Sequence, residues 1–529
     1  MEFRGLARRE PSAGSRALPR RTGLGKRSLL HAIALIFVRI LAPRPALSAP
    51  LDEPFVGGLG FNGPTSGNIA SIYWNPAALG LVRGFQLTIG GQVRYTSTHV
   101  SRTPVDPVTG AAKPAETASA SNVMQPASWP VGPGAFIGLS SDLGGDRFAL
   151  GFATYMPYVQ QIRYPLSPNG DEPTRYHALT IDLRNLALVP ALSIRIGSDL
   201  RIGVAPGFLF STGHLTFDED TNLDYKTPTT LCEGQHPCLE DPAAAARYDI
   251  SSGNGLGDAK FSVTLGGGIY FRRRSLEVGI AYQSHPLGTD VPGVEVAAQH
   301  TTVTLPPSSP GAGGLAGVPL SCTGPQSARC VFGDLSYRLP DVLMGGATWH
   351  VGTGLELTAM VRWSWFHVHD RIDVRLLGPS LEAANLPQHI VLYRGFNDVV
   401  DGRVRISYWW HERVRVGTTL RVETSAIDAN AVNPAAVDAL KIEPVAQAEV
   451  RIGRRLWIAG GWGITFMPSV TVTDSAFNPK LATDCVSSDG DLAPGGPCQA
   501  RLAGRARPSA NGHYSSMTQD FGLTVTVRY

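Results

Sequence analysis

Two histidine patterns in this sequence have a spacing that could support chemistry. His99 and Ser101 lie two positions apart, and so do His367 and His369, which Asp370 follows. Residues two apart share one face of a β-strand, so the first pair could serve nucleophilic hydrolysis and the second could hold a metal ion. Catalysis also needs a group that orients the base, and a metal site needs a third ligand. The sequence supplies neither, so we predict no enzyme and no metal site.

Four arginines could instead bind an anionic ligand. Arg362, Arg413, Arg415 and Arg421 lie in segments whose alternate positions are apolar. If the apolar face points outward, these guanidinium groups point inward, where one could hold a carboxylate through paired hydrogen bonds. The alternative is that they form ion pairs inside the structure with acidic residues such as Glu356. The sequence leaves both interpretations open.

The six cysteines form three local pairs in segments rich in Pro, Gly and Ser. The pairs are Cys232 with Cys238, Cys322 with Cys330, and Cys485 with Cys498. Six cysteines allow 15 connectivities, but each pair sits in its own loop, which favours local pairing. None has the short spacing of a zinc knuckle. We therefore predict three disulfides that staple three loops, and an oxidising compartment.

The elements that must carry these residues show the two-residue period of β-strands. From Leu355 to Trp365 the odd positions are apolar or aromatic, and from Met517 the last strand alternates in the same way and ends at Tyr529. One apolar and one polar face per strand, with a terminal aromatic residue, is typical of a membrane-spanning barrel. A helical interpretation fails, because the apolar period is two and glycine, 59 of 529 residues, is too frequent for long helices.

The strands are joined alternately by short turns and by long segments, which is the asymmetry of outer-membrane barrels. We expect long loops at 100–130, 218–256, 306–328, 424–441 and 474–514. The 15 candidate strands lie near 84–99, 131–143, 146–159, 176–196, 199–217, 257–272, 275–287, 292–305, 329–350, 354–369, 388–410, 413–426, 442–453, 455–473 and 515–529. Bacterial single-chain barrels have an even strand number, so we predict a closed antiparallel barrel of about 14 strands, with one candidate in error.

The amino terminus reads as a secretory signal peptide over residues 1–48, with a basic start, a short apolar stretch at 28–41 and a small-residue end. The first 49 residues hold ten Lys or Arg and two acids, which leaves 36 basic and 41 acidic residues in the rest. The net positive charge of +3 therefore belongs to the leader. Nothing suggests a nucleic-acid partner.

Residues 49–83 do not alternate, and we expect them to form a plug inside a barrel of residues 84–529. The run Ala70-Ser71-Ile72-Tyr73-Trp74-Asn75-Pro76-Ala77-Ala78-Leu79 resembles the amino-terminal hatch of the FadL family, the outer-membrane transporters of long-chain fatty acids and hydrocarbons. Segments at 257–284, 339–366 and 394–424 resemble later hairpins of that family in the same order. Candidate hatch residues are Asn68, Ser71, Tyr73, Trp74, Asn75, Pro76 and Ala77. Family hatches often carry an acidic pair before the Ala-Ser, whereas this chain has Ser66-Gly67-Asn68-Ile69 there.

The resemblance implies a monomeric channel in the bacterial outer membrane, surrounded by lipid and lipopolysaccharide. Hydrophobic molecules, long-chain fatty acids foremost, would bind inside, and hatch movement would release them through the barrel wall. No cofactor is implied. The alternatives are uptake of aromatic hydrocarbons and a structural, secretion or surface-assembly role for the same barrel. The sequence does not choose the cargo or place the lateral opening.

Overall fold

The computed structural model describes residues 51, 54–105, 111–124, 134–167, 170–220, 240, 245–252, 260–287, 294–298, 300–304, 319–320, 331–378, 381, 386–479, 481 and 503–529. The predicted signal peptide, residues 1–48, lies outside this part of the chain. All six cysteines lie outside it as well, so the three disulfides stay predictions. No helix in the described part is long and apolar enough to cross a membrane.

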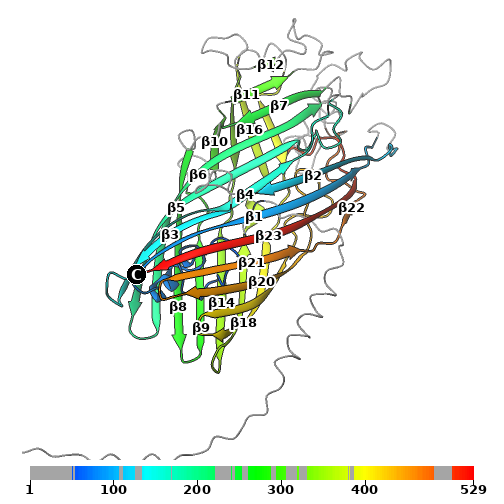
Figure 1. Cartoon of the computed structure of the whole chain (residues 1–529). Coiled ribbons are helices and arrows are strands. Elements are labelled where there is room, and N and C mark those ends of the chain that lie inside the picture. Colours follow the sequence, from blue (N-terminus) through cyan, green and yellow to red (C-terminus); the bar gives the residue numbers. More distant parts are fainter. Residues whose placement is uncertain are drawn as a thin grey trace, which may run out of the picture. The chain divides into compact units, whose positions relative to one another are not determined.

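Fourteen strands of the described residues form a closed antiparallel ring, which confirms the predicted fold (Figure 1). The last strand closes on the first, with Gln86 opposite Arg528 and Arg102 opposite Gly512. In ring order the wall strands are β1 (Phe85–Arg102), β3 (Ala135–Ser141), β4 (Phe148–Arg163), β5 (Thr180–Ile196), β6 (Leu200–Asp220), β8 (Lys260–Arg273), β9 (Leu276–Gln283), β14 (Val342–Val351), β15 (Leu355–Ser364), β18 (Val399–His411), β19 (Val414–Glu423), β20 (Lys441–Ile452), β21 (Leu456–Thr465) and β23 (Gly512–Arg528).

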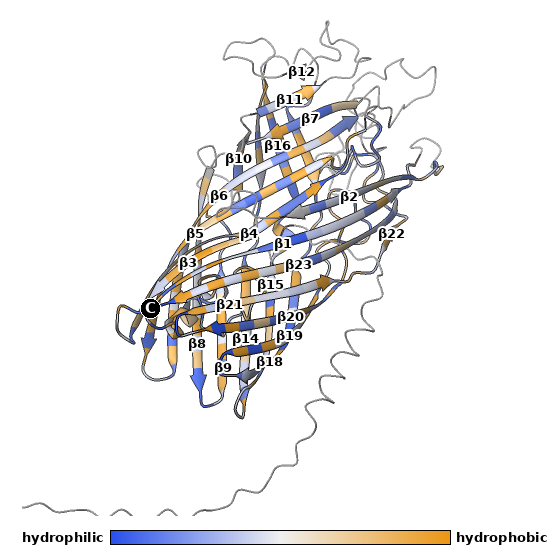
Figure 2. Cartoon of the chain, viewed as in Figure 1, coloured by the Kyte–Doolittle hydropathy of each residue, from blue (hydrophilic) through white to orange (hydrophobic). Residues whose placement is uncertain are grey.

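Side chains of opposite character alternate along each wall strand (Figure 2). In β23, Leu523 is 57% exposed and Phe521 49%, whereas Asp520 is only 1% exposed. The exposed apolar residues form the outward face, and the polar ones point into the barrel. This arrangement fits a wall whose outside is solvated by lipid hydrocarbon.

One end of the barrel carries the short turns, and we call it the short-turn end. Exposed aromatic residues gather there, as in the interfacial girdles of membrane barrels. They include Phe85, Phe148, Trp349, Tyr408, Trp410 and Tyr529. The opposite end, the long-loop end, carries the long connections between strands.

Further strands extend the structure at the long-loop end. The prediction of a wall strand at 292–305 was wrong: this segment forms β10 (Val294–Ala298) and β11 (His300–Thr304), which do not pair with the wall. β10 joins a four-stranded sheet with β13 (Phe332–Tyr337), β16 (Arg371–Leu377) and β17 (His389–Tyr393). β11 pairs with β7 (Ala245–Ser251) and β12 (Pro319–Leu320).

Two short strands complete the described part, together with three short helices. β2 (Glu116–Met124) and β22 (Val470–Val472) pair with β1 and β23. The helices are α2 (Ser71–Trp74), η1 (Pro76–Leu81) and η5 (Phe366–Val368).

Candidate functional site

The segment before β1 is buried inside the barrel, and we call residues 54–83 the hatch. Its centre is Asn75, which ends α2 and caps η1 in an extended conformation. The Asn75 Nδ2 donates to the main-chain oxygens of Pro64 (2.9 Å) and Ile269 (3.0 Å), and its Oδ1 accepts from the main-chain nitrogen of Ala77 (3.1 Å). Because Ile269 belongs to β8, this one amide ties two parts of the hatch to the wall.

Glycines on the inner face of the wall make room for this close approach. A Cβ on Gly268 would overlap the Asn75 side-chain oxygen, and a Cβ on Gly203 would overlap the main chain at Pro76 and Ala77. Small residues are thus required where two backbones meet. Ser193 Oγ adds a hydrogen bond of 2.8 Å to the Ala77 carbonyl.

Arginines of β18 and β19 hold the other side of the hatch. Arg403 donates to the Pro54 carbonyl at 2.8 Å, and its guanidinium lies 5.0 Å from the ring centre of Trp74. The Arg405 Nη1 donates to the Asn62 carbonyl at 2.9 Å. Cations over aromatic rings and charge-assisted hydrogen bonds are both stabilising in a desolvated interior.

The other predicted hatch residues also pack inside the barrel. Trp74 Nε1 donates to the Val56 carbonyl at 3.0 Å, and Tyr73 packs edge-on against Tyr155 of β4. Asn68 is half-buried and donates to the Asn62 side chain at 2.8 Å. Ser71, Tyr73, Trp74, Asn75, Pro76 and Ala77 are all buried.

Two of the four predicted ligand arginines are already engaged by carboxylates. Arg421 pairs with Asp401 (2.9 Å), Glu443 (2.8 Å) and Glu423, and Arg415 pairs with Glu356. These contacts are the internal ion pairs that the sequence left as an alternative. The Arg415 guanidinium also lies 3.9 Å from the ring centre of Phe61 in the hatch.

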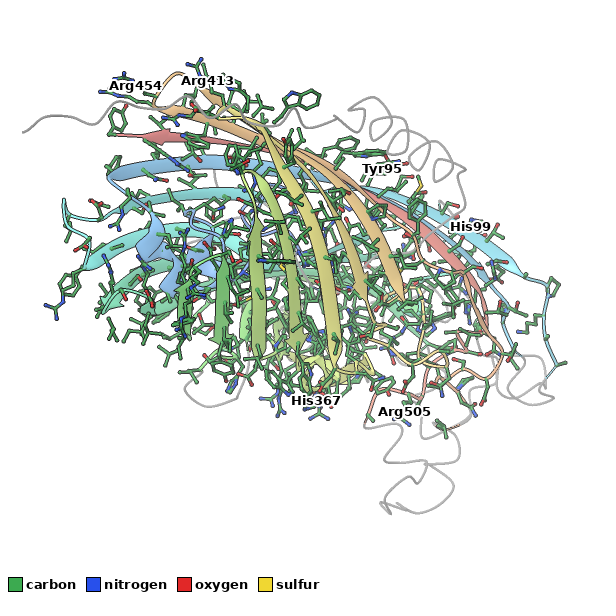
Figure 3. All side chains as sticks on the ribbon, turned by 90° about the horizontal axis from the view of Figure 1, so that it is seen from below. Tyr95, His99, His367, Arg413, Arg454 and Arg505 are labelled. Carbon is green, nitrogen blue, oxygen red and sulfur yellow. The ribbon has the colours of Figure 1, made fainter. Side chains whose placement is uncertain are left out.

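The remaining two arginines have different environments. Arg362 is buried on the inner face of β15, opposite Asp401 of the neighbouring strand β18. Arg413, which was expected to face inward, precedes β19 and lies exposed in the turn at the short-turn end, near Arg454 (Figure 3). Arg413 differs from the expectation because the strand alternation begins only at Val414.

A small cavity lies between the hatch and the wall strands β4 to β9. Its volume is about 30 Å³, and its walls are mainly apolar. Gln283 links the cavity to the hatch, because its Nε2 donates to the Tyr73 carbonyl at 2.7 Å. The lining residues are Ile72, Pro76, Tyr155, Pro157, Tyr158, Ala187, Val189, Ala205, Leu209, Thr264, Gly266, Gln283 and Ser284.

The wall is interrupted close to this cavity. Along one of its edges β1 pairs with two different strands. The pairing with β2 ends where Arg94 lies opposite Met124, and the pairing with β3 begins where Gly91 lies opposite Ala135. Only Gln92 and Val93 of β1 lie between these two pairings, and the Gln92 main-chain nitrogen still donates to the Gly134 carbonyl at 2.9 Å. Beside the interruption, Phe136 of β3 stacks on Tyr155 of the cavity lining, with ring centres 6.2 Å apart.

A second segment crosses the lumen at the long-loop end. Residues 424–440, which we call the outer loop, connect β19 and β20, yet they bond to β4 on the other side of the ring. Gln160 donates to the Ala435 carbonyl at 3.1 Å, and Tyr164 donates to the Pro434 carbonyl at 2.9 Å. The outer loop therefore covers the lumen. The sequence predicted a long loop at 424–441 but not that it crosses the lumen.

The two histidine patterns are not brought together into a reactive site. His99 Nδ1 lies 2.8 Å from Ser119 of β2 on the exposed side of the barrel. His367 is exposed beside Asp398, whereas His369 is buried with its Nδ1 2.7 Å from the Arg338 carbonyl. Among the described residues, no three potential ligands gather as a metal ion would need.

Sequence reasoning missed several residues that hold the hatch. Arg403 and Arg405 alternate with the apolar residues Val404 and Ile406, in the same way as the four candidate ligand arginines alternate with their apolar neighbours. That alternation was the available signal for an inward position, although it fails for Arg413, which precedes its strand. The role of Gln283 had no sequence signal, because the bond to Tyr73 depends on where the hatch lies.

Comparisons with known proteins agree with this architecture. The family model described as "Outer membrane protein transport protein (OMPP1/FadL/TodX)" matches residues 58–511. No curated protein matches the chain. A solved FadL homologue from Pseudomonas aeruginosa is 14% identical, with a TM-score of 0.66 over 92% of this chain and all of that one.

Two solved toluene transporters have the same fold. TodX of P. putida is 14% identical, with a TM-score of 0.56 over 90% of this chain and 99% of its own. TbuX of Ralstonia pickettii is 13% identical, with a TM-score of 0.53 over 89% and 98%. Identities this low show the fold alone, but the family model covers most of the chain. The protein therefore belongs to the FadL/TodX family of outer-membrane proteins that transport hydrophobic substrates.

Proposed function

We propose that this protein is a passive, monomeric channel that takes up long-chain fatty acids across the outer membrane. The ligand enters from the long-loop end, binds in the apolar cavity, and leaves sideways through the wall after the hatch moves. The single observation that carries the proposal is the cavity wedged between the hatch and the wall, with Gln283 contacting both.

The cavity explains why the hatch must move. A volume of about 30 Å³ holds two or three water molecules, and an acyl chain needs far more room. A ligand therefore enters only if the hatch shifts, and each buried methylene contributes about 0.8 kcal/mol toward that shift. Binding and hatch movement are coupled because the ligand stabilises only the displaced state.

The interruption beside Gln92 supports an exit through the wall at that point. Elsewhere continuous strand pairing would have to be broken, whereas here the partner on this edge of β1 changes from β2 to β3, and a single main-chain hydrogen bond, from Gln92 to Gly134, lies between the two pairings. Phe136 connects the interruption to the cavity through Tyr155. The released molecule would enter the lipid layer, and lipid and lipopolysaccharide would surround the outward face.

Aromatic hydrocarbons are the second candidate cargo. The small cavity and its uncharged lining favour a compact neutral molecule, and two solved proteins of the same fold are named as toluene transporters. A structural or surface-assembly role is the remaining alternative.

Filling the cavity tests the proposal. We would express the chain in cells lacking their own hydrophobic transporters and measure uptake of labelled oleate and toluene. Ala187→Phe places a ring in the cavity, whereas Leu188→Phe changes the neighbouring residue on the other face of β5. We expect several-fold slower uptake with Ala187→Phe only. Equal uptake by both variants would remove the cavity from the route, and no uptake by the wild type would favour the assembly role.

A further inference from the structure

Exposed arginines are concentrated at the short-turn end of the barrel. Eight of them lie in or beside the short turns, and we call them the arginine rim: Arg83, Arg147, Arg272, Arg273, Arg274, Arg413, Arg454 and Arg455. Figure 3 shows Arg413 and Arg454 together at this end. Among the described residues, only two exposed acidic side chains lie beside the rim, Asp146 and Glu412. The exposed side chains of this end therefore carry a net charge of +6, eight minus two.

The rest of the chain has the opposite charge. Residues 50–529 hold 36 Lys or Arg and 41 Asp or Glu. Without the arginine rim and its two acidic neighbours, 28 basic and 39 acidic residues remain, which is a net charge of −11. The rim is therefore a local concentration of positive charge on an otherwise acidic protein. Such a patch attracts anions within a Debye length, about 8 Å at physiological salt.

Most of the rim arginines make no ion pair with the described part of the chain. Arg272 is the exception, because its Nη1 lies 3.5 Å from a Glu277 oxygen. Asp146 pairs with Arg195, which is outside the rim, so this carboxylate does not neutralise the rim. Seven guanidinium groups are thus available to an anion from outside the protein.

The aromatic girdle places these charges at the level of the lipid head groups. The Arg147 guanidinium lies 5.6 Å from the ring centre of Phe148, and the Arg455 guanidinium lies 5.3 Å from the ring centre of Tyr529. Both rings are exposed. Exposed aromatic rings at the end of a membrane barrel mark the boundary between hydrocarbon and head groups. A cation next to such a ring is therefore within reach of a phospholipid phosphate.

The surface around the rim can contact both parts of a phospholipid. A guanidinium can donate two parallel hydrogen bonds to the oxygens of one phosphate. Exposed apolar side chains lie two residues away from rim arginines, Leu276 from Arg274 and Ile452 from Arg454. One lipid can thus place its phosphate on the rim and its acyl chains on the outward face. A soluble anion would use only the first of these contacts.

We propose that the short-turn end binds anionic phospholipids, with the lipid phosphates on the arginine rim. Outer-membrane barrels keep their short turns on the periplasmic side, so these lipids belong to the inner leaflet. Binding there holds the barrel at a fixed depth, because the girdle and the rim must both meet their own layer of the bilayer. The inference concerns the membrane around the barrel, and it is independent of the cargo and of hatch movement.

Lipid selectivity tests the proposal. We would reconstitute the purified protein in phosphatidylcholine vesicles with a trace of spin-labelled phosphatidylglycerol or spin-labelled phosphatidylcholine. Electron paramagnetic resonance then measures the fraction of each label that the protein immobilises. A basic residue at a membrane surface is worth about fivefold in affinity for anionic lipid. Because only one end carries the rim, we expect a preference for phosphatidylglycerol of about twofold or more, which 1 M NaCl should remove.

Two variants with the same loss of charge locate the site. The rim variant is Arg273→Gln/Arg274→Gln/Arg454→Gln/Arg455→Gln. The control replaces four exposed arginines at the long-loop end: Arg163→Gln/Arg338→Gln/Arg375→Gln/Arg505→Gln. The rim variant should lose most of the preference for phosphatidylglycerol, and the control should keep it.

Equal immobilisation of the two lipids by the wild type overturns the proposal, and this result needs no variant. A preference that survives in the rim variant also contradicts it. Equal losses in the two variants would assign the preference to total charge and not to the rim. Sodium phosphate, compared with sodium chloride at equal ionic strength, should weaken the preference no further. A larger loss in phosphate would show that the rim binds the free anion and not the lipid.

Discussion

Asn75 and Asn433 form the same turn in the two segments that cross the barrel lumen. Each begins an Asn-Pro-Ala-Ala run, and each side-chain oxygen accepts from the main-chain nitrogen two residues on, at 3.1 Å for Asn75 and 2.8 Å for Asn433. One turn lies in the hatch and the other in the outer loop. The hatch and the outer loop thus share the same local hydrogen bond at their Asn-Pro turns.

Removing the Asn75 amide should release the hatch. Asn75→Ala leaves the carbonyls of Pro64 and Ile269 and the nitrogen of Ala77 without their partner, at about 1–3 kcal/mol for each buried group. We expect a larger ion conductance in planar bilayers, because the loosened hatch admits water. Asn433→Ala is the matched change in the outer loop. A conductance equal to that of the wild type in Asn75→Ala would show that this amide does not hold the hatch.

The fit between hatch and wall should be sensitive to a single methyl group. Gly268→Ala places a Cβ against Asn75, and overpacking of this kind costs about 1–3 kcal/mol. Gly267→Ala is the control, because its Cβ would meet only the Gly203 carbonyl, at 3.8 Å. Protease cleavage within the hatch should increase for Gly268→Ala alone. Equal cleavage of the two variants would argue against the close packing.

The ion pairs behind the hatch should dominate the stability of that side of the barrel. Asp401 accepts from Arg403 and Arg421, so Asp401→Asn leaves two buried cations with fewer partners. Loss of one partner of a buried pair costs about 3–5 kcal/mol. Urea unfolding in lipid should show this loss, whereas the half-exposed Asp398→Asn should unfold like the wild type. A change below 1 kcal/mol in Asp401→Asn would contradict the assignment.

The long-loop end should loosen in acid. Burial, together with Arg102 and Arg507, lowers the pKa of His177 well below 6.5, and its Nε2 lies 3.0 Å from the Pro508 carbonyl. The unfolded state takes up a proton near pH 6.5, but the folded state does not. Stability is therefore full above pH 6.5 and falls by about 1.4 kcal/mol for each pH unit below it.

Hydrogen exchange around His177 measures this effect. Protection, corrected for intrinsic exchange, should be lower at pH 5.5 than at pH 7.5. His177→Gln removes the titrating ring and should abolish the difference. The edge contact with Phe477 would be lost in this variant at every pH, so only the pH dependence is diagnostic. Unchanged pH dependence in His177→Gln would assign the effect to another group.

The wall of this barrel could be predicted because lipid outside and polar atoms inside impose a period of two. The last strand and the segment from Leu355 both followed that rule. The same rule wrongly placed residues 292–305 in the wall, because strands of a sheet outside the wall show the same alternation as wall strands. It also missed β2, since the sequence Glu116–Met124 is small and polar and shows no apolar face.

The site was less predictable than the wall. The hatch residues were found by a contiguous motif, but their partners come from strands far away in the sequence, such as Arg403 of β18. Gln283 is another example, because its bond to the Tyr73 carbonyl depends on where the hatch lies and not on the pattern of β9. Contacts that depend on the folded arrangement leave no local signal.

The central claim is that the hatch must move for a molecule to pass, and a reversible lock tests it most directly. A Cβ on Gly60 would lie 3.5 Å from the Ala459 Cβ of β21, which suits a disulfide. We would measure oleate uptake by Gly60→Cys/Ala459→Cys after oxidation and after reduction, with each single variant and the wild type treated alike. The account predicts that uptake falls to background in the fully oxidised double variant and returns on reduction. Uptake at the wild-type rate with the disulfide fully formed would contradict it.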